Sequence, residues 1–251
     1  MALDPTASVI QGLRLSVDLP TQLTITVDTG TAYLPDNTRI IVTAPMLVTL
    51  SAPAAGTWYH AYVFQASSGV AGFEVVTDAP STPYAGTART KQGDVTRRYV
   101  GSIVIGSNGK AIPFKHVSVG TTCRVQYIQG LPVANATAGG LTLLTGGTAT
   151  AVSNVSALTA VPITASIMMA QFLNSSTYDA YLGNPDQPNA LSATSAIRVV
   201  LARSCVPVDL PLSGSGQFNY MLAATNLLGT LTGVLFSGSL TGQVTGHIYD
   251  R

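Results

Sequence analysis

The sequence predicts an all-β protein built from two β-sandwich or barrel-like domains. Charged residues (Asp, Glu, Lys and Arg) make up only 9% of the 251 residues. An ordinary soluble domain has about 25%, and helical bundles, coiled coils and disordered chains are all rich in charge, so these classes are excluded. Turn-forming residues are abundant, with 24 glycines and 14 prolines. Apolar residues alternate with a period of two in short runs, with turns roughly every 8–12 residues, which is typical of a sandwich or barrel.

The first half of the chain shows this alternation most clearly. Alternate residues from Leu13 to Leu19 are apolar, as expected for a strand with one buried face. Turn residues separate the runs, and the dipeptide Asn108-Gly109 is the sharpest hairpin signal. The predicted strands are 13–19, 23–27, 31–34, 38–43, 46–51, 57–65, 72–77, 97–105, 111–119 and 122–128. Together they predict an N-terminal β domain over residues 1–128.

The second half, residues 129–251, is expected to form a C-terminal β domain. Its predicted strands are 141–144, 149–155, 163–172, 196–202, 218–223 and 230–237, with a short helix within 168–181 or 218–228 as an alternative. The 54 residues from Val125 to Tyr178 include no charged side chain. A lone domain with so little charge tends to associate, so we expect an obligate oligomer. The alternative is that Thr, Ser and Asn solubilise an uncharged β surface.

Composition and charge exclude several function classes. A net charge of +1 displaces few counterions, so we expect no nucleic-acid partner. The mean hydropathy of +0.35 is high, but no apolar run reaches the roughly 18–20 residues that cross a bilayer, so we expect no membrane insertion. The first residues carry Asp4 and lack a basic region followed by an apolar core, which predicts synthesis in the cytoplasm without a secretory signal.

No catalytic or metal-binding pattern stands out. His60, His116 and His247 fall in separate elements without metal-ligand spacing, and we expect them to be half-buried strand residues. We therefore predict no enzyme activity and no cofactor or metal. Cys123 and Cys205 lie far apart in the sequence without a CxxC pair, and we expect both to be reduced and largely buried.

An ordered series of short motifs fills residues 57–103. The motifs are Thr57-Trp58-Tyr59-His60-Ala61-Tyr62-Val63, Phe73-Glu74-Val75-Val76-Thr77, Ala79-Pro80, Pro83-Tyr84, Gly86-Thr87-Ala88-Arg89-Thr90-Lys91, Gly93-Asp94 and Arg97-Arg98-Tyr99-Val100-Gly101-Ser102-Ile103. This order resembles a β-rich module of tail fibre, baseplate and receptor-binding proteins of tailed bacteriophages and prophages. The resemblance covers roughly residues 10–120, and the second half of the chain lies outside it.

The resemblance implies a structural, often trimeric part of the phage adhesion apparatus. We therefore expect a virion protein of a tail tip or fibre that is assembled in the host cytoplasm as a homotrimer. Its expected partners are other tail proteins and a glycan or pilus on the host cell surface. The alternative is a purely structural baseplate, collar or capsid-decoration subunit without receptor binding. A cellular adhesin module and an enzyme that trims surface polysaccharide are two further alternatives.

Receptor contact is expected within residues 174–189, the most polar stretch of the second half. Loops on a rigid β scaffold usually carry binding residues. The residues expected to bind are Tyr178 and Tyr181, through ring stacking on a sugar, and Asp179, Asn184 and Asp186, through hydrogen bonds to hydroxyl groups. The alternative is a plain connecting loop or a loop that packs on a neighbouring subunit.

The connection from residue 78 to 97 lacks the strand pattern and leads into a basic segment. Long connections in compact domains are usually functional or interfacial. The basic residues of the segment are Arg89, Lys91, Arg97 and Arg98. Three roles are open for them: a solvated loop, salt bridges between subunits or domains, or contact with phosphates on the host surface.

Overall fold

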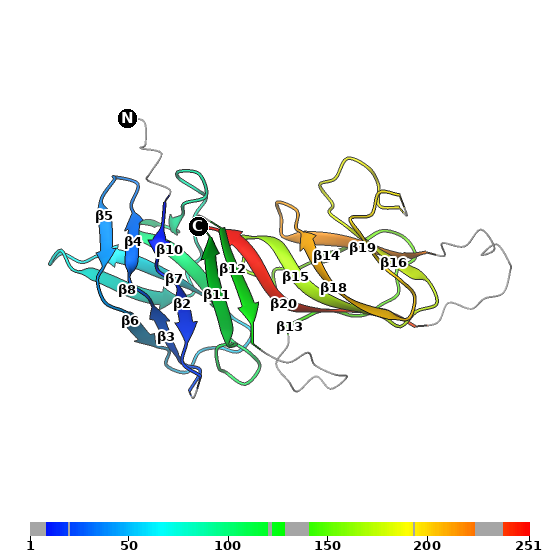
Figure 1. Ribbon diagram of the computed structural model, residues 1–251, viewed down its shortest axis with the longest axis horizontal. Coiled ribbons are helices and arrows are strands. Elements are labelled where there is room, and N and C mark those ends of the chain that lie inside the picture. The colour runs from blue at the N-terminus through cyan, green and yellow to red at the C-terminus, as the bar shows by residue number, and fades with distance from the viewer. Residues whose placement is uncertain (1–8, 20, 120–121, 129–140, 193, 224–237) are drawn as a thin grey trace. The chain divides into compact units, whose positions relative to one another are not determined.

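The chain divides into two compact units of β structure. The computed structural model describes residues 9–19, 21–119, 122–128, 141–192, 194–223 and 238–251 (Figure 1). None of these residues lies in a helix, which confirms the all-β prediction. Unit 1 comprises Met1–Gly139 and Tyr249–Arg251, and unit 2 comprises Gly140–Ile248. The sequence predicts a division after residue 128, and residues 129–140 lie outside the described part. Tyr249–Arg251, expected in the second domain, belong to unit 1.

Unit 1 consists of antiparallel strands in three sheets and one hairpin. The strands are β1 (Gln11–Gly12), β2 (Leu15–Val17), β3 (Thr24–Val27), β4 (Gly30–Tyr33), β5 (Arg39–Val42), β6 (Met46–Thr49), β7 (Trp58–Gln65), β8 (Ala71–Val76), β9 (Thr90–Lys91), β10 (Asp94–Val104), β11 (Phe114–Val119) and β12 (Thr122–Tyr127). The sheets have the orders β1-β4-β5, β2-β3-β6 and β8-β7-β10-β9, and β11 pairs with β12. One hydrophobic core joins them.

Strand β7 lies in the middle of this core. Ala61 and Val63 on one face and Tyr62 on the other are fully buried, as expected for a strand that is apolar on both sides. Polar side chains on the Tyr62 face are hydrogen-bonded to one another. The Ser102 hydroxyl lies 2.8 Å from His60 Nδ1 and 2.7 Å from the Tyr99 hydroxyl. The buried side chains of His60 and Tyr99 therefore share Ser102 as a hydrogen-bond partner.

The last residues of the sequence complete the core of unit 1. Arg251 is fully buried, and its guanidinium donates hydrogen bonds to the carbonyl oxygens of Leu13 at 2.7 Å and Gly12 at 2.6 Å. Gly12 and Leu13 both have positive φ (69° and 52°), a conformation that strains a leucine. The Tyr249 hydroxyl donates to the carbonyl oxygen of Val100 at 2.9 Å. Arg251 and Tyr249 therefore bond to the first residues of unit 1 and to β10, respectively.

The burial of His60 predicts a loss of stability in acid. Burial lowers the pKa of His60 from 6.5 to about 4, with a smaller opposing effect of Asp78. Between these two values the unfolded chain binds the extra proton and the folded chain does not, so the stability falls as pH falls from 6.5 towards 4. We expect unit 1 to lose about 2–3 kcal/mol between pH 7 and pH 4.5.

Denaturant unfolding followed through Trp58, the one tryptophan of the chain, measures this loss in unit 1. The variant His60→Gln, which keeps a hydrogen-bonding group beside Ser102, serves as the control. It should show a much smaller change in unfolding free energy between the two pH values. An equal change in the variant and the parent protein would exclude His60 as the cause.

Unit 2 contributes four strands to each of the two sheets of a sandwich. Its strands are β13 (Leu141–Gly147), β14 (Ser153–Ser156), β15 (Ala165–Asn174), β16 (Asp179–Gly183), β17 (Arg198–Val200), β18 (Ser204–Pro211), β19 (Gln217–Ala223) and most of β20 (Leu240–Asp250). In one sheet β20 pairs with β13 and β15, and β15 pairs with β18; the other has the order β14-β19-β16-β17. Consecutive strands alternate between the two sheets, except that β16 and β17 share one, and this is the strand arrangement of a jelly roll. Phe172 of one sheet packs edge-on against Phe218 of the other, with ring centroids 5.9 Å apart.

Several details of the second half differ from the sequence-based expectations. The alternative helix within 168–181 is wrong, because these residues form β15, a turn and β16. Strands β16, β18 and β20 were not predicted, while the predicted strand 230–237 lies outside the described residues. The three histidines lie in strands but are buried rather than half-buried. Cys123 is buried as expected, whereas Cys205 is exposed.

Candidate functional site

A buried asparagine joins two loops at one end of unit 2. Asn174, the last residue of β15, is fully buried. Its side-chain amide donates hydrogen bonds to the carbonyl oxygens of Tyr178 at 2.8 Å, Val200 at 2.9 Å and Leu201 at 3.2 Å. Its oxygen accepts bonds from the backbone N–H and the hydroxyl of Ser176. Asn174 therefore connects the two loops by hydrogen bonds, and we call them the loop pair 175–178 and 201–203.

Strand β16 divides the predicted receptor site into two parts. Tyr178 and Asp179 lie where β16 begins, and Asn184 and Asp186 lie beyond its end. At about 3.3 Å per residue, the strand places Asp179 roughly 16 Å from Asn184. Tyr178 and Asp179 are therefore not clustered with Asn184 and Asp186. Asn184 and Asp186 have structural contacts of their own, because Asp186 Oδ2 accepts a hydrogen bond at 2.7 Å from the backbone N–H of Gly214.

Tyr181 cannot stack on an external ligand. It lies in β16 opposite Met221 of β19, and only 1% of its surface is exposed. The polar sequence around it suggested a loop, but a five-residue strand carries it into the packed part of the unit. The assignment of Tyr181 to a receptor site is therefore wrong.

The loop pair presents side chains of three kinds. Tyr178 is half-buried, Leu201 is 60% exposed, and Arg203 is exposed. Asp179 supports the arrangement, since its carboxylate accepts a hydrogen bond at 2.8 Å from the backbone N–H of Ala202. Arg203 adopts a left-handed conformation with φ of 55°, which costs energy for an arginine. Of the residues predicted to bind, only Tyr178 and Asp179 belong to this surface.

Sequence reasoning missed Leu201 and Arg203. Arg203 is one of only two basic residues between residues 140 and 248, the other being Arg198. A basic residue in a half of the chain with so few charges is a sequence signal that could have identified Arg203. The loop pair is the candidate functional site of the protein.

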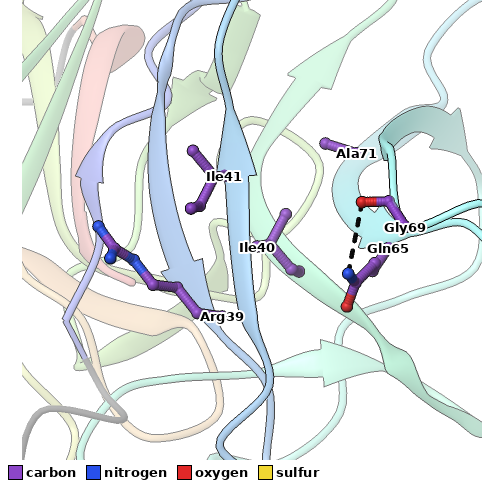
Figure 2. Close-up of a pocket in the computed structure, with 6 residues that line it drawn as sticks. All are labelled: Arg39, Ile40, Ile41, Gln65, Gly69 and Ala71. Carbon is purple, nitrogen blue, oxygen red and sulfur yellow. Dashed lines mark hydrogen bonds between the residues drawn. The ribbon is translucent and has the colours of Figure 1, made fainter.

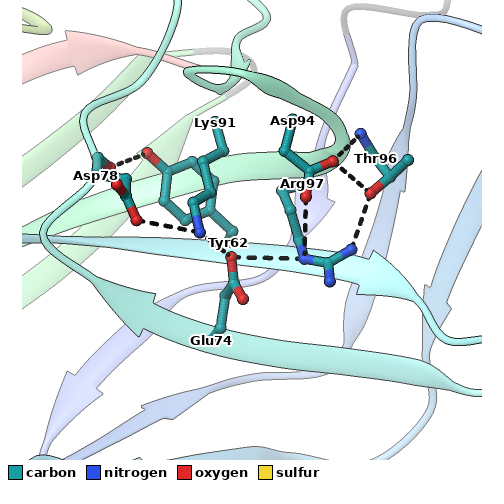
Figure 3. Close-up of polar contacts among 7 residues, drawn as sticks. All are labelled: Tyr62, Glu74, Asp78, Lys91, Asp94, Thr96 and Arg97. Carbon is teal, nitrogen blue, oxygen red and sulfur yellow. Dashed lines mark hydrogen bonds and ion pairs between the residues drawn. The ribbon is translucent and has the colours of Figure 1, made fainter.

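The basic segment of unit 1 forms ion pairs within its own sheet (Figure 3). Lys91 Nζ lies 3.2 Å from Glu74 Oε1 and 3.2 Å from Asp78 Oδ2. Arg97 Nε lies 3.5 Å from the same Glu74 oxygen and 3.9 Å from Asp94 Oδ2. Glu74 is the only glutamate of the chain and joins both cations. Such partly exposed pairs each contribute about 0–1 kcal/mol, so their main effect is to hold side chains in place.

The other two basic residues bond to the backbone of the same segment. Arg89 Nη1 donates to the carbonyl oxygen of Ser81 at 2.8 Å. Arg98 is fully buried and donates to the carbonyl oxygens of Arg89 at 3.2 Å and Tyr99 at 3.1 Å. Burial lowers the pKa of Arg98 to about 10, which leaves it charged at neutral pH.

Of the three roles expected for the basic segment, the solvated loop does not match the structure, because all four cations have partners and Arg98 is buried. These partners are residues of unit 1. Salt bridges to another subunit and contact with host phosphates stay predictions. The arrangement makes the 78–98 connection a fixed part of the β8-β7-β10-β9 sheet.

A small depression of about 100 Å³ opens on unit 1 (Figure 2). It is lined by Arg39, Ile40, Ile41, Gln65, Gly69 and Ala71. The Gln65 amide donates to the Gly69 carbonyl oxygen at 3.4 Å and so faces the hairpin rather than the opening. Ligand pockets usually enclose about 300–1,000 Å³, and this depression is well below that range.

The described part of the chain contains no group of three or more His, Cys, Asp or Glu side chains placed to hold a metal ion. No helix in it is long and apolar enough to span a membrane.

Comparisons with known proteins leave the family of this chain open. No protein-family model matches it, and no curated protein matches it. Among solved structures, it is similar to the N-terminal CBM22-1–CBM22-2 tandem domain of Xyn10C from Paenibacillus barcinonensis. The alignment covers 91% of this chain and 87% of that chain at 10% identity, with a TM-score of 0.21. A score this low does not establish a shared fold and carries no argument about function.

Proposed function

We propose that this chain is a structural virion protein of a phage tail tip or fibre that attaches to the host cell surface. In this proposal unit 1 is the part that holds the protein in the tail, and unit 2 carries the host-binding surface. The protein would act as a homotrimer beside other tail proteins. It would bind a surface glycan or a pilus through the loop pair 175–178 and 201–203.

The resemblance to tail proteins supports the assignment of unit 1. The motifs that carry it fall on β7, β8, β9 and β10 and the 78–89 connection, which form one sheet with its covering loop. The polar residues of the motifs bond to one another: Tyr62 donates to the carbonyl oxygen of Asp78 at 2.7 Å, and Lys91 pairs with Glu74. The module therefore uses its polar groups internally, which suits a structural role and leaves host contact to unit 2.

The observation that carries the proposal is the rigid loop pair of unit 2. Binding surfaces gain affinity when their loops are ordered before contact, because less conformational entropy is lost. Asn174 and Asp179 supply this order, and Tyr178, Leu201 and Arg203 supply a ring, an aliphatic side chain and a cation. Together these groups suit a glycan with acidic or hydroxyl groups, or the side of a pilus. Jelly-roll domains are frequent in viral capsid proteins and lectins.

A purely structural baseplate, collar or decoration subunit is the second candidate. The observation that favours it is the exposed pair of Leu173 on β15 and Cys205 on β18, which offers contact to another protein rather than to a glycan. The two candidates differ in one respect: only the first requires the loop pair to bind host cells.

Replacing Arg203 by asparagine is expected to weaken binding to host cells at least tenfold. Asparagine tolerates the left-handed conformation, so the loop keeps its shape while the guanidinium is lost. The matched control is Arg198→Asn, which removes the other cation of unit 2 at the opposite end of β17. Binding of the purified proteins to host cells would be measured by flow cytometry. Equal binding by both variants and the parent protein would show that the loop pair does not bind the host.

A further inference from the structure

Arg203 is a basic residue for which the described part of the chain supplies no partner. Its guanidinium makes no hydrogen bond or ion pair with the described residues, whereas Arg198, the other basic residue of unit 2, donates to the carbonyl oxygen of Ile197 at 3.4 Å. Of the residues outside the described ranges, only Asp4 carries a carboxylate. An anion for Arg203 therefore comes most directly from another molecule.

Arg203 also has a backbone conformation that is unusual for an arginine. It is the third residue of the turn Leu201–Ser204, which is closed by a hydrogen bond from the Ser204 N–H to the Leu201 carbonyl oxygen at 3.2 Å. Its φ is 55°, and glycine or asparagine is preferred where a turn requires positive φ. Of the five residues other than glycine with positive φ in the described part, Arg203 is the one that carries a charge. A charged side chain at a strained position suggests a functional role.

Hydrogen bonds from two other segments hold this turn. Asn174, at the end of β15, donates to the carbonyl oxygen of Leu201 at 3.2 Å. Asp179, at the start of β16, accepts from the backbone N–H of Ala202 at 2.8 Å. The backbone that carries Arg203 is therefore ordered before a ligand arrives, which lowers the entropy cost of binding.

The charges near the turn limit the ligand to a group with a single negative charge. The carboxylate of Asp179 lies beside the turn and lowers the positive potential that a ligand meets there. A phosphate monoester carries about −1.5 to −2 charges at pH 7, which is more than one cation beside one carboxylate can balance. A carboxylate carries one charge, and its planar group meets the planar guanidinium of Arg203 through two parallel hydrogen bonds.

We propose that Arg203 binds the carboxylate of an acidic sugar in a glycan on the host cell surface. The inference rests on the proposed function, since it names the ligand class of the loop pair. Leu201, which is 60% exposed in the same turn, offers an aliphatic surface to the C–H groups of the sugar. A pilus protein is less suitable, because a protein partner usually covers about 800 Å² and the two loops are short.

Chemical reduction of the glycan tests the proposal, because it converts carboxylates to alcohols and leaves phosphate groups in place. Polysaccharide extracted from host cells would be immobilised before and after carboxyl reduction, and binding of the purified protein measured by biolayer interferometry. The parent protein should bind the reduced polysaccharide at least tenfold more weakly. Arg203→Asn should bind both forms equally weakly, since the two changes remove the same interaction. The control Arg198→Asn should behave like the parent protein.

Three outcomes would overturn the proposal. Undiminished binding to the reduced polysaccharide would assign another group, such as a phosphodiester, to Arg203. Binding to host cells but not to the untreated polysaccharide would indicate a protein receptor. In both cases the proposed function stands if Arg203→Asn still loses binding to host cells, and it fails if this variant binds cells normally. The third outcome is an Arg203→Asn variant that unfolds at clearly lower denaturant concentration than the parent protein, because the guanidinium would then have a partner within the chain.

Discussion

Replacing Asn174 by alanine is expected to lower the free energy of unfolding of unit 2 by about 3–4 kcal/mol. The change removes three hydrogen bonds to the carbonyl oxygens of Tyr178, Val200 and Leu201, and two bonds from Ser176. Each buried group left without a partner costs about 1–3 kcal/mol, and neighbouring losses do not add fully. A loss of this size in the free energy of unfolding lies in the upper part of the range for single substitutions.

Hydrogen exchange read by mass spectrometry locates this effect. The Asn174→Ala variant should exchange much faster in β15, β16 and β17, while the amides of β7 and β10 in unit 1 keep their protection. Ser175→Ala is the control in the same loop, since it removes only two exposed hydrogen bonds, from the Ser175 hydroxyl to the Ser239 carbonyl oxygen and from the Ser239 N–H to the Ser175 hydroxyl. It should change the stability by less than about 1 kcal/mol. Normal protection in the Asn174 variant would show that the loops are held by other contacts.

Replacing Arg251 by alanine is expected to destabilise unit 1 by about 3 kcal/mol. The carbonyl oxygens of Gly12 and Leu13 and the hydroxyl of Ser118 would lose charged donors at 2.6, 2.7 and 3.0 Å. The left-handed conformation of Leu13 would lose the contact that supports it. The side chain also leaves a space in the core, which adds to the loss.

Unfolding followed by the fluorescence of Trp58 measures this second effect. The transition of Arg251→Ala should move to clearly lower denaturant concentration at an unchanged slope. Arg14→Ala, which removes an exposed guanidinium from the same unit, should stay within about 0.5 kcal/mol of the parent protein. Equal transitions in the two variants would contradict the role assigned to Arg251.

The elements that sequence patterns predicted well are those whose local pattern matches their packing. Strand β7 is apolar on both faces and is buried on both faces. Strand β16 was missed because it has only five residues between polar loops. Strand β18 was missed because Pro207, Asp209 and Pro211 interrupt its pattern, yet an edge strand tolerates them.

Contacts between distant residues could not be read from the sequence. Nothing in the spacing of Glu74 and Lys91 says that their strands place them 3.2 Å apart. The same holds for the candidate site: Asp179 and Asn184 are close in sequence and separated by a strand, whereas Tyr178 and Leu201 are far apart in sequence and joined by Asn174. Both the Glu74–Lys91 contact and the candidate site depend on which strands and loops pair in three dimensions. The periodicity of the sequence gives no information about this pairing.

Locating the chain on virus particles is the most direct test of the proposal that it is a phage tail protein. Particles released from cells that make this protein would be labelled with a gold-conjugated antibody against unit 2 and imaged by electron microscopy. The account predicts gold at the free end of the tail, where host contact occurs. Gold over the head, gold in a ring along the tail, or particles without gold would contradict it.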